Sequence, residues 1–324
     1  MNRRRVLNGV RGIYLGSRVR ELVPSRLKVR LRRGWLALAR RAGYPISSPR
    51  LARPHLARGR KRFRLGRVLL ASDLNRDYLE FWPSTRRAWQ EIVGLDPLLV
   101  LVAPSHEIPP ELRDDPAVVH FEPLVGVHSA FQAQCIRLLY PALVETEAAV
   151  IIADIDLYPL RPSYFHEPVK SLDERFFVVY RDDRLDRGEI DIMFNAALPT
   201  TWGEVFGVST IEDVRSELAR WAHRLEYDGR RGWPGWYTDQ RTLHDRLLSW
   251  PARSERLWML DDQYTLYWRL NRDKLVDEAG LEPWRIEGIR RCEYSDFNCF
   301  VPYREHREIN DRVLELGLEA ARRQ

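Results

Sequence analysis

The fold is decided around one stretch of the chain, Val150-Ile151-Ile152-Ala153-Asp154-Ile155-Asp156-Leu157. Its short β-branched run predicts a strand buried on both faces rather than a helix. Side chains alternate along an extended chain, so Asp154 and Asp156 are expected on one side, with their Cα atoms roughly 6.6 Å apart. Because ligands of open α/β sheets bind beyond the carboxyl ends of the strands, this pair of acids predicts a divalent metal that holds a phosphorylated ligand. An acidic turn that caps the next segment is the alternative.

Strands and helices alternate on both sides of this motif. Before it, we expect strands at 67–72, 97–102 and 117–121 and helices at 77–93 and 128–144. After it, we expect strands at 176–180 and 189–197 and helices at 210–227, 239–248 and 305–323, with Thr238 as the N-cap of the second of these helices. Buried strands that alternate with helices indicate an α/β fold with a mainly parallel central sheet and right-handed crossovers.

Charge divides the chain into two parts. Residues 1–67 hold 21 Lys and Arg and one acid, a balance of +20, whereas the remaining 257 residues have a balance of −14. We therefore predict a basic N-terminal arm and linker at 1–66 and one enzyme-sized domain at 67–324. Residues 22–42 are rich in Arg and Leu and contain Trp35, a composition that suits a helix on an anionic membrane surface. A solvated tail is one alternative, and a nucleic-acid-binding segment is another that the scarcity of aromatic residues disfavours.

The cysteines and the apolar runs predict the compartment. Cys135, Cys292 and Cys299 make no disulfide framework and indicate free thiols in a reducing environment. The sequence has no run of about eighteen apolar residues, and arginines interrupt any signal-peptide core near the N-terminus. These features predict a cytoplasmic protein, with the basic arm holding it peripherally at the inner face of a membrane.

Phosphate-binding loops are missing from the sequence. Neither G-x-G-x-x-G nor G-x-x-x-x-G-K-[ST] occurs. A sugar-phosphate nucleotidyltransferase would carry a Gly-rich, Lys-containing loop after its first strand, and Ala71-Ser72-Asp73-Leu74-Asn75 has neither feature. The phosphates of a nucleotide would therefore have to be held in another way, and a metal on the paired acids would supply it.

Three segments carry a family resemblance. The helix segment 134–141, the acids Asp154-Ile155-Asp156 and the later Trp236-Tyr237-Thr238-Asp239-Gln240 together resemble nucleotide-sugar glycosyltransferases of the GT-A fold, over about residues 67–305. The resemblance implies an α/β fold of the GT-A type. It also implies a hexosyltransferase-like enzyme that moves a sugar from a nucleoside-diphosphate sugar to an acceptor hydroxyl on a glycan or a lipid-linked molecule. A non-catalytic protein that binds membrane or nucleic acid through its arm is the alternative.

The resemblance also implies roles for single residues. Asp156 and Asp154 would bind Mn²⁺ or Mg²⁺, which prefer oxygen ligands, and Asp154 would also contact the ribose. Asp239 would either take the proton of an acceptor hydroxyl or, with Gln240, line the donor sugar. The other expectations are a nucleotide site at Ser72, Asp73 and Arg137, a close approach of the ligand at Asn195, and a metal site completed by Asp296 or Asn298, with His306 and His244 as further candidate ligands.

Overall fold

The computed structural model describes residues 61–323 apart from 183, 224–226, 228, 230–234, 261–267 and 273–281. The predicted basic arm therefore lies outside the described residues up to residue 60. Phe63 and Leu65, which the predicted boundary assigns to the arm and linker, are buried in the core of the domain. In the described part of the chain, no helix is both long enough and apolar enough to cross a bilayer.

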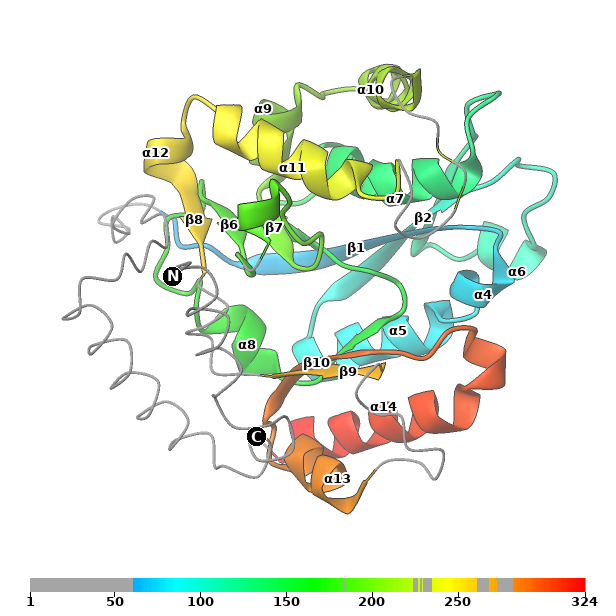
Figure 1. Ribbon diagram of the computed structural model, residues 1–324, viewed down its shortest axis with the longest axis vertical. Helices are drawn as coiled ribbons and strands as arrows, with labels where there is room; N and C mark the ends of the chain where they lie inside the picture. The colour runs from blue at the N-terminus through cyan, green and yellow to red at the C-terminus, as the bar shows by residue number, and fades with distance from the viewer. Residues whose placement is uncertain are drawn as a thin grey trace, which may run out of the picture.

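A seven-stranded sheet in the order β3-β2-β1-β4-β7-β6-β8 forms the centre of the molecule (Figure 1). Strands β1, β2, β3 and β4 run parallel to one another, β7 is antiparallel to both β4 and β6, and β8 is parallel to β6. The predicted α/β class with a mainly parallel sheet is thus confirmed. The strands are β1 (Leu65–Asp73), β2 (Asp96–Val102), β3 (Val118–Phe121), β4 (Ala149–Ile152), β6 (Phe177–Val179), β7 (Asn195–Ala197) and β8 (Leu257–Met259).

Strand β4 lies in the middle of this sheet and is buried on both faces, as its sequence predicts. Ile151 packs into the hydrophobic cluster on one face, whereas Val150 and Ile152 pack into the cluster on the other. None of the three side chains is exposed to solvent, because neighbouring strands and two layers of helices surround them. This alternation fixes the direction in which the chain leaves the sheet toward Asp154.

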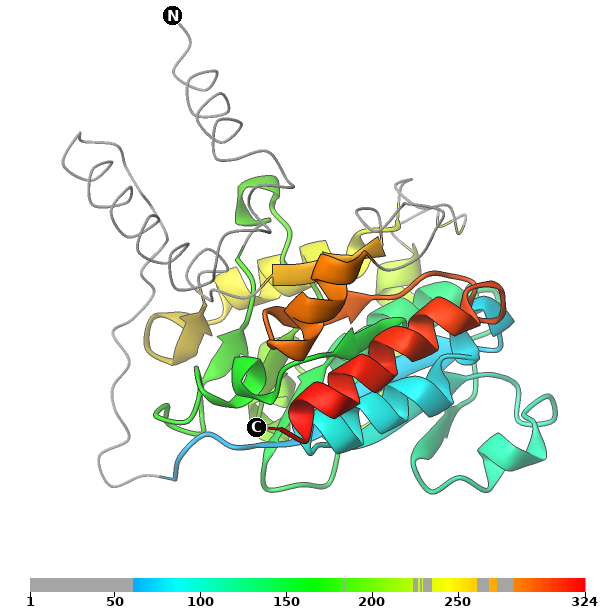
Figure 2. The ribbon, with the colours of Figure 1, turned by 90° about the horizontal axis from the view of Figure 1, so that it is seen from below.

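Helices cover both faces of the sheet. Figure 1 shows α7 (Ser129–Leu139), α9 (Pro199–Phe206) and α11 (Thr238–Ser249) above the strands, and α5 (Trp82–Ala88) and α14 (Arg307–Ala321) below them. In Figure 2 the last helix, α14, lies alongside α5. The remaining helical segments are α4 (Arg76–Leu79), α6 (Pro110–Arg113), α8 (Pro162–His166), α10 (Ile211–His223), α12 (Arg253–Arg256) and α13 (Pro283–Arg290).

Several predicted boundaries are wrong, and local chemistry explains the differences. The helix predicted at 77–93 is divided among α4, α5 and a π-helical turn at Trp89–Val93, and the one predicted at 128–144 ends as α7 before a 3₁₀ turn at Tyr140–Leu143. Proline in the first turns of α5 and of the 3₁₀ segment favours a helix start there, because proline lacks an N–H. Only the end of the predicted strand 189–197 is extended, as β7. The backbone N–H of Ile190 donates its hydrogen bond to the carbonyl of Gln240 and not to a neighbouring strand.

A second, three-stranded sheet in the order β5-β10-β9 was not predicted. Its strands are β5 (Leu157–Pro159), β9 (Trp268–Asn271) and β10 (Tyr294–Asn298). Because β5 begins directly after Asp156 and pairs with β10, this sheet brings the C-terminal part of the domain beside the paired acids.

Candidate functional site

An arginine joins two of the predicted site residues at the carboxyl edge of the central sheet. Asp154 follows β4 on the side of α7, and Arg137 of α7 forms an ion pair with its carboxylate through Nη1. The other terminal nitrogen of Arg137, Nη2, lies 3.3 Å from Oδ2 of Asp239. The side chain of Arg137 is only 8% exposed. The fold therefore brings the buried Arg137 and Asp239 together with the partly exposed Asp154 in one cluster, although Asp239 lies 102 residues beyond Arg137.

The carboxyl group of Asp239 is held in a low-dielectric position. It lies in the first turn of α11, is buried, and accepts a hydrogen bond of 2.8 Å from the backbone N–H of Gln240. Burial raises the pKa of Asp239 to about 7, because the charge of Arg137 only partly offsets the cost of desolvation and Asp154 adds repulsion. Asp239 is thus a carboxyl group that gains and loses its proton near neutral pH.

The turn before α11 fixes the position of Asp239. Gly235 has a φ of +88°, and a Cβ atom added there would lie 3.2 Å from Cα of Tyr227, so the turn needs glycine. Thr238 Oγ1 donates a 2.6 Å hydrogen bond to the carbonyl of Gly235. Thr238 is therefore the first residue of the helix, not its N-cap as predicted, and its side chain closes the turn instead of capping the helix.

Two buried amide oxygens at this edge have no hydrogen-bond partner among the described residues. They are Oδ1 of Asn195 and Oε1 of Gln240. Asn195 lies opposite Ile152 of β4, and its Nδ2 donates to the carbonyls of Asp191 and Ile192, at 2.8 and 2.7 Å. A buried acceptor without a donor is costly, so both oxygens are suited to accept hydrogen bonds from a ligand.

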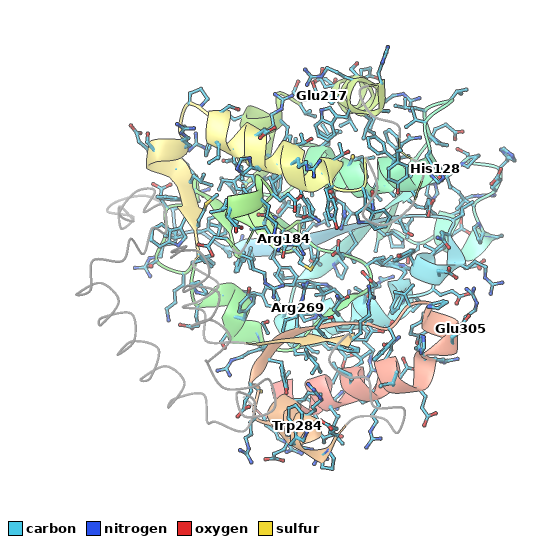
Figure 3. The ribbon with its side chains drawn as sticks, in the orientation of Figure 1. His128, Arg184, Glu217, Arg269, Trp284 and Glu305 are labelled. Carbon is cyan, nitrogen blue, oxygen red and sulfur yellow. The ribbon has the colours of Figure 1, made fainter. Side chains whose placement is uncertain are left out.

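The loop that carries Asn195 is anchored by an ion pair. Arg184 Nε lies 2.6 Å from Oδ1 of Asp191, the residue whose carbonyl accepts from Asn195. In Figure 3, Arg184 and Arg269 lie toward the middle of the molecule, whereas Glu217 and Trp284 lie on the outer helices α10 and α13. The anchored loop holds the amide of Asn195 in a fixed orientation.

Ser72 and Asp73 lie at the end of β1, near the cluster but already bonded. Ser72 is buried and its Oγ donates to the carbonyl of Asp73 at 2.9 Å. The carboxylate of Asp73 accepts from Ser129 Oγ at 2.8 Å and from the backbone N–H of Asn75 at 3.1 Å. These contacts tie the end of β1 to the start of α7, and a nucleotide-binding role for the two residues stays a prediction.

The second acid of the motif has an arginine partner of its own. Oδ2 of Asp156 lies 3.1 Å from Nη1 of Arg272, which directly follows β9. Burial raises the pKa of Asp156, the neighbouring Asp154 raises it further, and Arg272 opposes both effects. Asp154 and Asp156 are thus close enough to repel each other, and each is paired with a guanidinium group.

Asp296, one of the predicted metal ligands, is fully buried in β10 between two arginines. Its Oδ1 pairs with Arg181 and its Oδ2 lies 3.0 Å from Nε of Arg269. Burial alone would raise its pKa, but Arg181 and Arg269 together lower the pKa of Asp296 below its usual value. Asp296 therefore stabilises the second sheet as a carboxylate whose two oxygens are already occupied.

The other candidate ligands lie apart from such a site or offer weak donors. Asn298 ends β10 opposite Leu157, one residue from Asp156, and carries a neutral amide. The ring of His306 packs against Phe300, and His244 Nδ1 lies 2.9 Å from Asp245. Among the described residues, no three His, Cys, Asp or Glu side chains form a group that could hold a metal ion. The donor set therefore does not fit the divalent ion expected from the sequence, since two arginines occupy the paired acids and two more occupy Asp296.

Three arginines of this region were not among the residues predicted from the sequence, namely Arg181, Arg269 and Arg272. Each lies just beyond or within a short strand, and β9 has only four residues, too few for its alternation of apolar and polar residues to predict a strand. A signal was nevertheless present, because two neighbouring carboxylates repel each other unless a cation lies between them and the sequence is rich in arginine.

Comparisons with known proteins find similarity only at the level of structure. No family model and no curated protein sequence matches the chain. Among solved structures, the glycosyltransferase GlyE of Streptococcus pneumoniae aligns with a TM-score of 0.41 and 14% identity over 78% of this chain. The alignment spans 63% of the length of GlyE.

Two further solved structures align comparably. The galactosyltransferase LgtC, in complex with donor and acceptor sugar analogs, has a TM-score of 0.40 and 13% identity over 77% of this chain and 94% of its own. The glucosyl-3-phosphoglycerate synthase of Mycobacterium tuberculosis, in complex with Mn²⁺, UDP and glucosyl-3-phosphoglycerate, has a TM-score of 0.33 and 13% identity over 61% of this chain and 70% of its own.

Proposed function

We propose that this protein is a glycosyltransferase of the GT-A type, which moves a sugar from a nucleoside-diphosphate sugar to an acceptor hydroxyl. The observation that carries the proposal is the cluster at the carboxyl edge of the sheet, in which Arg137 joins Asp154 to Asp239. This edge is where open α/β folds bind their ligands. The site also contains no Gly-rich loop, so it differs from the common nucleoside-triphosphate sites.

The donor and acceptor groups of the site suit a sugar. A sugar ring presents several O–H donors, and the site offers acceptors in the carboxylate of Asp239 and the buried amide oxygens of Asn195 and Gln240. A hydroxyl-rich ligand could donate hydrogen bonds to both of these amide oxygens, which would remove the free-energy cost of burying them without a donor. A site built for an apolar ligand would not bury them.

The pKa of Asp239 suits the proton transfer that the reaction needs. In the transfer, a bond forms between the acceptor oxygen and the anomeric carbon, the bond from that carbon to the phosphate oxygen breaks, and the acceptor proton is released. A carboxylate with a pKa of about 7 can accept a hydroxyl proton at neutral pH. The proposal assigns no step to a metal, because the donor set of the described residues does not fit one.

A screen of nucleotide sugars by thermal unfolding tests the proposal. The full chain is heated with UDP-, GDP- and dTDP-sugars, each with EDTA and with Mn²⁺. A ligand that binds only the folded chain stabilises it by about 2.7 kcal/mol at a concentration 100 times its Kd. We expect a rise of several degrees in Tm with one donor class and a much smaller rise in Asp239→Asn. No rise with any nucleotide sugar in either condition would overturn the proposal.

We further propose that the acceptor is a membrane-linked glycan reached from the cytoplasmic side. Support comes from the sequence alone, in the balance of +20 over residues 1–67. Such an arm would be drawn to anionic lipids, each basic residue near the surface contributing about 1 kcal/mol. Cosedimentation of the full chain with phosphatidylserine vesicles should be strong at low salt and weak above about 0.5 M, since salt screens surface charge. Binding that ignores salt, or that is missing at low salt, would contradict this part.

A further inference from the structure

The arginine that pairs with Asp156 has an unusual combination of contacts. Arg272 Nη1 bonds both the carboxylate of Asp156 and the carbonyl of Cys299. The backbone of Cys299 in turn donates a 3.0 Å hydrogen bond to the carbonyl of Asp156. One guanidinium group is therefore held against the second acid of the motif from two directions, at the place where a divalent cation was expected.

The remaining donors of Arg272 are available to a ligand. Within the described residues, its Nε and Nη2 make no hydrogen bond, and the side chain is 21% exposed. Arg137 differs in both respects, because its three nitrogens contact Gln134, Asp154 and Asp239 and it is 8% exposed. Arg272 is thus the accessible cation of the pair.

Because Asp154 and Asp156 are each paired with an arginine, few free carboxylate oxygens remain among the described residues of the site to bind a divalent ion. A metal needs deprotonated, unpaired oxygens, and Asp156 would have to break its ion pair with Arg272 before it could serve. Asp296 cannot replace it, because Arg181 and Arg269 hold both of its oxygens in a fully buried position. A guanidinium group thus holds the carboxylate oxygen of Asp156 that a metal would need.

We propose that Arg272 supplies the positive charge that binds the diphosphate of the donor, so that donor binding does not require a divalent metal. This inference rests on the proposed function and concerns the same site. A guanidinium presents a planar fork of N–H donors that matches two phosphate oxygens, and it keeps its charge at any physiological pH. As the nucleoside diphosphate departs, its negative charge develops next to this fork, where a fixed cation stabilises it.

Titration calorimetry with nucleoside diphosphates tests the inference. UDP, GDP and ADP are each titrated into the full wild-type chain in EDTA and in Mn²⁺, and then into Arg272→Gln, Arg272→Lys and the control Arg253→Gln, which alters an exposed arginine of α12. Circular dichroism and Tm establish that each variant is folded. We expect the wild-type Kd to differ less than threefold between EDTA and Mn²⁺.

The affinity of the Arg272 variants for nucleoside diphosphates tests the inference more sharply than the affinity of the wild type. Arg272→Gln should weaken binding at least tenfold in EDTA, and Mn²⁺ should restore part of it, because Asp156 is then free to bind an ion. Arg272→Lys should be intermediate, and Arg253→Gln should match the wild type. Wild-type binding that needs Mn²⁺, or a folded Arg272→Gln that binds normally in EDTA, would overturn the inference while leaving the proposed function intact. Lack of binding under every condition would overturn both.

Discussion

Asp239 shows how one residue is tuned by its surroundings. An aspartate is normally ionised at neutral pH, but burial in the first turn of α11 raises the pKa of Asp239 to about 7. Arg137 limits the rise because it lies 3.3 Å from Oδ2. The balance between these two effects leaves the carboxyl group half-protonated at neutral pH, which suits proton exchange with a hydroxyl.

This pKa makes a prediction about stability. The folded-state pKa of Asp239 lies above its unfolded value of 3.8, so the folded state holds the proton more tightly. The stability linked to this proton is complete below pH 3.8 and is lost as the pH rises to about 7. Asp239→Asn removes that loss. We expect its Tm, relative to the wild type, to increase between pH 4 and 7 and to stay level above, whereas Asp245→Asn on the exposed side of α11 shows no such trend. A difference independent of pH would contradict the assigned pKa.

The acids of the site could be predicted from the sequence, but their partners could not. A buried strand followed by Asp154 and Asp156 has a recognisable pattern, and a Trp-rich turn marks Asp239. Arg137 was predicted to lie near the site as a phosphate partner, whereas the structure uses it to bridge two carboxylates. Which of many arginines meets a given acid depends on tertiary contacts between distant elements, and periodicity carries no information about these.

At the scale of elements, β10 determines what the C-terminal part of the domain contributes. It pairs with β5 and β9, and so places Asp296 among Arg181 and Arg269 instead of beside the paired acids. The strongly apolar strands β1, β2 and β4 could be predicted because both of their faces are buried. The short strands β5 and β9 could not, because their order depends on pairing across the chain.

The ion pairs of Asp296 predict a structural effect for its replacement. Asp296→Asn would remove the counter-charge of the buried Arg181, which it shares with the partly exposed Arg269, and breaking a buried ion pair typically costs about 3–5 kcal/mol. Asp311→Asn is the matched control, since that carboxylate is 39% exposed on α14 and an exposed ion pair such as the one it forms with Arg307 contributes little to stability. Urea unfolding measures both. An Asp296→Asn variant of normal stability would show that the arginines do not depend on this acid.

At the scale of the whole molecule, two layers of helices cover the two faces of the central sheet (Figure 1), and the site lies beyond the carboxyl end of β4. Strand order could not be foreseen, because the sequence pattern predicts which segments are strands but not that β7 pairs antiparallel with β4. That pairing places Asn195 opposite Ile152, two residues before Asp154, and so completes the set of acceptors at this edge.

The release of nucleoside diphosphate from nucleotide sugars tests the central claim most directly. The full chain is incubated with UDP-, GDP- and dTDP-sugars, with and without a glycan acceptor, and the freed diphosphate is measured over time. We predict release from one donor class, a rate at least about 100-fold lower in Asp239→Asn because a positioned proton acceptor is lost, and an unchanged rate in Asp245→Asn. No release from any donor, or the same rate in Asp239→Asn as in the wild type, would contradict the account.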